Sequence, residues 1–170
     1  ILSGTNTVKG FYEDYPGIQA AAGKTLIING TGSLTASSYN YAAAIGGGSD
    51  VACGNIEIQG GTITATSGGR YAGIGGGYNA SCGNITISGG TVTATGGEDA
   101  AGIGGGRGYN SGILSSCGTI TITTDVTKVT ATKGEYATNS IGAGNVGTCG
   151  TVTIGGTQGA KTDSPYTYQP

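Results

Sequence analysis

Aromatic, guanidinium and amide side chains gather on both sides of a short motif, Ile-Gly-Gly-Gly, that recurs along the chain. Aromatic rings pack against the apolar faces of sugars, and amide or guanidinium groups donate hydrogen bonds to sugar hydroxyls, so this combination predicts carbohydrate contact. The competing interpretation is that the tyrosines only cover glycine-rich corners of the backbone. The candidate glycan contacts are Tyr41, Arg70, Tyr71, Tyr78, Asn79, Arg107, Tyr109, Asn110 and Tyr136.

Threonines at alternate positions form a second candidate surface. Alternate residues of a strand point to one side about 6.7 Å apart, and neighbouring strands lie about 4.8 Å apart, so these hydroxyls and methyls would form a flat grid. Such a grid resembles the ice-binding faces of β-solenoid antifreeze proteins, although threonine is also simply a strong strand former. Lys9 and Lys128 interrupt the grid in the first and last coils. The candidates are Thr62, Thr64, Thr66, Thr91, Thr93, Thr95, Thr130 and Thr132.

The cysteines recur once per repeat, at Cys53, Cys82, Cys117 and Cys149. Metal sites built from cysteine use close pairs such as CxxC, which this chain lacks, so no metal site is predicted. Either the thiols stay free as a small apolar ladder, or neighbouring coils are joined by Cys53–Cys82 and Cys117–Cys149 disulfides. We expect the free ladder, with the disulfides as the alternative.

The chain offers few candidate catalytic residues, because it has no histidine and so lacks the commonest general base. An enzyme would have to use carboxylates. The best cluster is Glu98 and Asp99, which could approach Arg70 and Glu135 because all four precede the glycine motif in successive repeats. Solvated turn charges explain the same residues, so we expect a non-catalytic protein without a cofactor.

Composition limits the partners. The 170 residues include 38 glycines, with 7 basic against 9 acidic side chains and a net charge of −2. Without a basic cluster or an apolar run near the roughly 20 residues of a membrane span, neither nucleic acid binding nor membrane insertion is expected. The first residue is Ile rather than Met, and the chain is interpreted as a fragment or processed form.

The repeat predicts the element that positions all these residues. The glycine motif begins at Ile45, Ile74, Ile103 and, weakened, Ile141. The first three copies are followed by CGxIxI and then by a threonine-rich block, and the fourth is followed by CGTVTI. Within the blocks apolar residues alternate with period two, which indicates strands. Two strands and a short third element in about 29 residues describe one coil of a solenoid. We predict an all-β, single-stranded parallel β-helix with three faces and about five coils.

The alignment of the repeats also predicts which residues stack. The chain is expected to form one domain, with a degenerate cap coil at 1–30, regular coils at 31–154 and a second cap at 155–170. Thr5, Thr7 and Lys9 take the places of Thr91, Thr93 and Thr95, and Ile18 takes that of Ile103. Pro165 and Pro170 should end strand pairing. Inward ladders are expected at Ile56, Ile85, Ile120 and Val152, at Ile58, Ile87, Ile122 and Ile154, and at Ala36, Ala65, Ala94 and Ala131, with end layers covered by Phe11, Tyr12, Tyr166 and Tyr168.

The blocks AAAIGGG, YAGIGGG and AAGIGGG, each followed by CGxIxI, together with GGTxTAT, resemble the glycine-rich β-helix repeats of large secreted or cell-wall-attached proteins of gut and other anaerobic bacteria. The resemblance covers almost the whole chain. It implies a right-handed coil, an extracellular or cell-surface location and an adhesion-like or carbohydrate-binding role, without agreed functional residues. We therefore expect a non-catalytic surface module that acts as a rigid spacer and contacts glycans. Ice binding is the alternative, and a degenerate polysaccharide-active enzyme is the third hypothesis.

Overall fold

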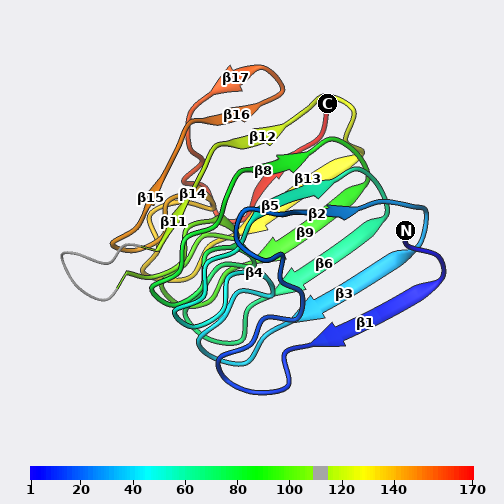
Figure 1. Cartoon of the computed structure of the whole chain (residues 1–170). Coiled ribbons are helices and arrows are strands. Elements are labelled where there is room, and N and C mark those ends of the chain that lie inside the picture. Colours follow the sequence, from blue (N-terminus) through cyan, green and yellow to red (C-terminus); the bar gives the residue numbers. More distant parts are fainter. Residues whose placement is uncertain (109–114) are drawn as a thin grey trace.

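The computed structural model describes residues 1–108 and 115–170. These residues form strands and turns and contain no helix. The described part of the chain therefore has no helix that could cross a membrane. Successive strands stack in parallel as a β-solenoid of about five coils (Figure 1). The predicted fold class is confirmed.

Two long sheets run the length of the stack. The first, called here the threonine sheet, consists in spatial order of β1 (Thr5–Lys9), β3 (Ser33–Ser37), β6 (Thr62–Thr66), β9 (Thr91–Thr95), β13 (Lys128–Thr132) and β18 (Tyr166–Tyr168). The second, the isoleucine sheet, consists of β2 (Thr25–Ile28), β5 (Asn55–Ile58), β8 (Ile85–Ile87), β12 (Ile120–Ile122), β16 (Val152–Ile154) and β17 (Thr157–Gln158).

The glycine motif supplies a third, shorter face. Its two-residue strands, called here the corner strands, are β4 (Ile45–Gly46), β7 (Ile74–Gly75), β10 (Ile103–Gly104) and β14 (Ile141–Gly142). A further small sheet pairs β11 (Ser116–Cys117) with β15 (Thr148–Cys149). Because the isoleucines of the corner strands pair directly with one another, every coil brings the residues around this corner to the same edge of the molecule.

The core is a set of stacked apolar ladders between these faces. Ile56, Ile85 and Ile120 pair in register on the isoleucine sheet and are fully buried. Ala65 pairs with Ala94 on the threonine sheet, also fully buried. Each buried isoleucine contributes roughly 1.5 to 3 kcal/mol, and a one-residue slip would turn a whole strand inside out, so the register is strongly specified. The predicted ladders are confirmed.

Glycine is required at the corner itself. Gly75 has a φ of 138°, which side-chain-bearing residues rarely adopt, and a Cβ there would collide with the carbonyl oxygen of Gly104 in the next coil. Gly46 and Gly104 meet their own neighbours in the same way. The corner therefore depends on glycine both for its backbone conformation and for the close approach of successive coils.

The first coil follows the predicted register. Thr5, Thr7 and Lys9 of β1 pair with Ser33, Thr35 and Ser37 of β3, and Ile18 forms a parallel bridge with Ile45. The prediction that Phe11 and Tyr12 cover the apolar end layer is wrong, because the two side chains are 80% and 61% exposed. They lie in the turn after β1, where the Tyr15 amide donates to the Tyr12 carbonyl at 3.2 Å, and this turn carries the rings away from the core.

The last coil departs from the predicted end of pairing. Directly after Pro165, β18 pairs antiparallel with β13, and β17 folds back antiparallel on β16. The open edge of a sheet offers unpaired amides and carbonyls to any extended segment. The C-terminal segment therefore continues the strand pairing although its sequence no longer follows the repeat. Tyr166 and Tyr168 pack partly buried against the core, as predicted for this end.

The cysteines are paired rather than free, so the expected thiol ladder is wrong and the alternative is confirmed. Disulfides join Cys53 to Cys82 and Cys117 to Cys149, with Cα atoms 4.7 and 4.6 Å apart. Cys82 and Cys117 also form a parallel bridge, which places the four residues in one row. The spacing between coils puts successive cysteines within bonding reach.

Candidate functional site

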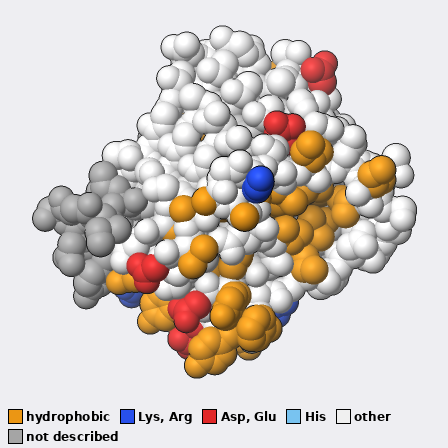
Figure 2. Space-filling view, viewed as in Figure 1, with side chains coloured by type: hydrophobic (Ala, Val, Ile, Leu, Met, Phe, Trp, Pro, Cys, Tyr) orange, Lys and Arg blue, Asp and Glu red, His pale blue; other side chains and the backbone are white. Residues whose placement is uncertain are grey.

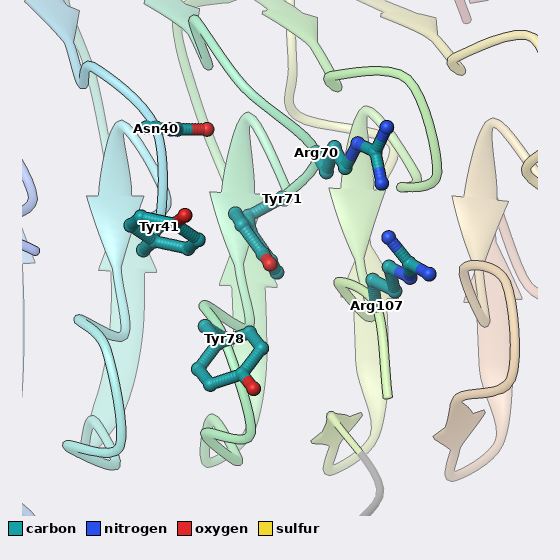
Figure 3. A pocket seen from close by; sticks show the side chains of 6 residues that line it. All are labelled: Asn40, Tyr41, Arg70, Tyr71, Tyr78 and Arg107. Carbon is teal, nitrogen blue, oxygen red and sulfur yellow. The ribbon is translucent and has the colours of Figure 1, made fainter. Parts of the chain in front are cut away.

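Six of the side chains around the glycine corner line one open hollow of about 500 Å³, called here the tyrosine depression (Figure 3). They come from three successive coils. The lining residues are Asn40, Tyr41, Arg70, Tyr71, Tyr78 and Arg107. Five of the nine predicted glycan contacts therefore lie together.

The repeat explains why these side chains meet. Tyr41 and Arg70 stand four residues before the isoleucines of β4 and β7, and Tyr78 stands four residues after the isoleucine of β7. The Tyr78 amide donates to the Tyr41 carbonyl at 3.0 Å, so the segments before and after the corner are joined across neighbouring coils. Side chains that are 29 to 37 residues apart in sequence thus become neighbours.

Three tyrosine rings form the apolar part of the depression. The Tyr41 and Tyr78 centroids are 5.7 Å apart, those of Tyr71 and Tyr78 are 5.9 Å apart, and both pairs meet edge to face. Such edge-to-face pairs hold their rings in a fixed orientation. Tyr71 is only 2% exposed, and its burial raises the pKa of its phenol above the usual value, against an opposing effect from the Arg107 charge. The hydroxyl therefore stays protonated at neutral pH and can both donate and accept.

A buried carboxylate anchors the polar part. Asp99 is 5% exposed and accepts a hydrogen bond from the Asn145 amide at 2.8 Å. One of its oxygens lies 3.7 Å from Nε of Arg70 and 3.5 Å from Nη1 of Arg107. Glu98 holds the same Arg70 Nε more closely, at 2.8 Å. The two guanidinium groups are thus fixed beside the rings, as Figure 3 shows.

The expected approach of Glu98 and Asp99 to Arg70 is confirmed, whereas Glu135 takes no part in an ion pair among the described residues. Over residues 1–108 and 115–170 there is no group of three or more His, Cys, Asp or Glu side chains placed to hold a metal ion. The carboxylates nearest the depression serve to hold the arginines.

Among the described residues, two of the predicted glycan contacts, Asn79 and Tyr136, do not line the depression. Asn79 has a positive φ of 47° and its amide donates to Asp50 at 3.2 Å, which turns it along the neighbouring loop. Tyr136 is 56% exposed but lies outside the lining. Tyr109 and Asn110 fall outside the described residues. Asn40 lines the depression but was not predicted as a glycan contact. Its position between two tyrosines was the one feature of the sequence that could have indicated it.

The threonine grid has the predicted register. Thr64 pairs with Thr93, and Thr93 pairs with Thr130, with equivalent rows on either side. β18 adds Thr167, whose hydroxyl lies 3.3 Å from that of Thr130. Lys9 and Lys128 stand in the outer rows as expected. The candidate ice-face residues therefore share one outward surface of the threonine sheet.

Comparison with known proteins adds one match. A family model described as a beta helix repeat matches residues 26–49, 56–78 and 85–107, which are three consecutive coils containing much of the tyrosine depression. No curated protein and no solved structure matches the chain. The repeats are thus similar to β-helix repeats in sequence as well as in structure.

Proposed function

We propose that this chain, a stack of β-helix repeats, is a non-catalytic extracellular module that binds carbohydrate in the tyrosine depression and acts as a rigid spacer on a bacterial surface protein. The observation that carries the proposal is a cluster of three tyrosines, in which Tyr78 meets both others edge to face, beside two arginines held by a buried carboxylate. Such an arrangement exists before any ligand arrives, so little ordering cost accompanies binding.

The chemistry of the lining matches a sugar. Tyr41 and Tyr78 offer ring surface to the C–H faces of a pyranose, while phenol hydroxyls and the Asn40 amide can exchange hydrogen bonds with its hydroxyls. The Nε of Arg70 is held by Glu98 and Asp99, and the Arg70 side chain is 47% exposed, so a ligand can reach part of this guanidinium group. Aromatic surface beside fixed donors is the combination that orients a polyhydroxylated ligand.

Two features support an extracellular location. Disulfides persist in oxidising compartments and are rare in the cytosol, and both pairs here join successive coils. The charge-poor, hydroxyl-rich surface also fits the resemblance to bacterial surface repeats. Rigidity follows from stacking, since each internal coil is held by two neighbours.

Affinity electrophoresis tests the proposal. The protein is run in native gels containing xylan, glucomannan, laminarin, hydroxyethylcellulose, starch or pectin, and a glycan array is probed in parallel. We expect selective retention that Tyr78→Ala and Tyr41→Ala remove, while Tyr136→Ala, which truncates an exposed ring outside the depression, leaves it intact. Absence of retention and of array signal at high protein concentration would reject carbohydrate binding. Release of reducing ends from a retained polysaccharide would instead support the degenerate-enzyme hypothesis.

Ice binding is the second candidate, favoured by the continuous register of threonines from β6 through β13. Thermal hysteresis and ice recrystallisation assays test it. If the grid binds ice, Thr93→Lys at its centre abolishes the activity, whereas Thr121→Lys on the outer side of the isoleucine sheet does not. Absence of hysteresis in the unaltered protein would remove this candidate.

A further inference from the structure

A second group of aromatic side chains lies beside the tyrosine depression. Phe11, Tyr12, Tyr15 and Tyr39, called here the N-terminal aromatic cluster, are each at least half exposed. The Phe11 and Tyr15 rings stack with centroids 4.6 Å apart, and the Lys9 ammonium lies 4.2 Å from the Tyr39 centroid. Figure 2 shows hydrophobic side chains gathered over the loop that follows β1. Hydrophobic surface concentrated in one place on a soluble protein indicates a binding function.

The cluster and the depression share a wall. A hollow of about 260 Å³ is lined by Phe11, Tyr12, Glu13 and Tyr39. Asn40 and Tyr41, which follow Tyr39 directly, line the tyrosine depression. The Tyr41 amide donates to the Glu13 carbonyl at 2.7 Å, which fixes the loop after β1 against this shared segment. The two hollows therefore border the same segment, residues 39–41.

We infer that the two hollows are subsites of one surface and that the ligand is a polysaccharide chain rather than a single sugar. This inference rests on the proposed carbohydrate binding. Phe11 belongs to the first coil, Tyr41 to the second and Tyr78 to the third, so the aromatic surface spans two coil spacings, about 10 Å. That span exceeds one pyranose ring, and both hollows are open to the surface, which lets a chain continue past either end.

The cluster has the chemistry for such an extension. The stacked pair of Phe11 and Tyr15 presents a flat apolar surface, and the Glu13 carboxylate beside it accepts hydrogen bonds from sugar hydroxyls. The neighbouring depression supplies the polar anchors. Binding energy is thus divided between an orienting subsite and a stacking subsite.

Isothermal titration with oligosaccharides of two to six units, prepared from each polysaccharide retained in the gels, tests the inference. We expect the hexasaccharide to bind about tenfold or more tightly than the disaccharide, because an added aromatic contact is typically a dominant energetic anchor. The double variant Phe11→Ala/Tyr12→Ala should lose this gain and keep disaccharide affinity, whereas Tyr78→Ala loses both. Tyr136→Ala is the control for an exposed ring, and thermal melts confirm that the variants are folded.

Three results would overturn it. Equal affinity for disaccharide and hexasaccharide, with Tyr78→Ala still abolishing binding, leaves the proposed function intact and removes the second subsite. No retention of any polysaccharide removes both. A sedimentation experiment in which a dimer of the unaltered protein becomes a monomer in the double variant assigns the cluster to contact between copies of this chain.

Discussion

The backbone amide of Tyr78 and the carbonyl oxygen of Tyr41 are 3.0 Å apart, and this hydrogen bond is one of a series. Ser49 donates in the same way to Asp14 at 3.0 Å, and Asn145 donates to Asp99 at 2.7 Å. In each case a residue four positions after a corner isoleucine contacts one four positions before the preceding isoleucine. The backbone of the edge is therefore repeated, while its side chains differ from coil to coil.

Tyr78 should contribute to binding more than to folding. Tyr78→Ala removes a ring that meets both Tyr41 and Tyr71, and we expect a loss in polysaccharide affinity of about tenfold or more, as for other central aromatic anchors. Titration calorimetry measures the affinity. Tyr78→Phe retains the stacking surface and should keep most of the binding, so equal losses in the two variants would argue against a stacking role.

Asp99 should support both stability and the site. Asp99→Asn removes the charge that faces Arg70 and Arg107, and because this carboxylate is buried, the expected loss in the free energy of unfolding is about 1 to 3 kcal/mol. Polysaccharide affinity should fall as well, since the guanidinium groups lose their anchor. Glu98→Gln is the matched control: its side chain is 41% exposed, so we expect less than about 0.5 kcal/mol. Urea unfolding of both variants compares them.

The disulfides should stabilise the solenoid through the unfolded state. They span 29 and 32 residues, and loop-closure entropy gives each an upper contribution of about 3 to 4 kcal/mol. We expect Cys53→Ala/Cys82→Ala to lower the melting temperature, and a reducing agent to lower that of the unaltered protein further, because two bridges are then lost. Non-reducing peptide mass spectrometry checks the pairing, and a Cys82–Cys117 peptide would contradict the structure.

Gly75 should tolerate substitution by alanine far less well than a glycine that has a similar φ but open space around it. Gly75 and Gly159 have φ values of 138° and 130°, but an added Cβ meets the Gly104 carbonyl only at Gly75 and finds open space at Gly159. Gly75→Ala should therefore destabilise the protein strongly, while Gly159→Ala carries only the conformational strain. Thermal unfolding measures the difference, which isolates close coil packing from the positive φ. Equal effects would mean that packing at the corner is unimportant.

The periodic part of the fold could be predicted from sequence because each repeat supplies its own alignment. The pairing of Ile74 with Ile103 and of Thr64 with Thr93 follows from their equivalent places in the repeat. The end of the chain offered no such alignment. β18 pairs with β13 because an open edge is available, and that opportunity is a property of the assembled sheet.

The sequence was sufficient to predict which edge of the solenoid carries the candidate site, but not which side chains line the tyrosine depression. Tyr41, Tyr71 and Tyr78 could be assigned to the corner by their distance from the isoleucines. Whether a side chain turns inward depends on its local contacts, and Asn79 turns towards Asp50 instead. Cysteine pairing was undecidable for a related reason, since one coil spacing suits both a thiol ladder and a disulfide.

The positions of the disulfides have a mechanical consequence. Pulling a solenoid from its ends peels coils away one after another, and each freed residue lengthens the chain by about 3.4 Å. The disulfides Cys53–Cys82 and Cys117–Cys149 prevent the residues between each pair of cysteines from being stretched out. The oxidised molecule would thus stretch by about 200 Å less than the reduced one, limiting its extensibility under load.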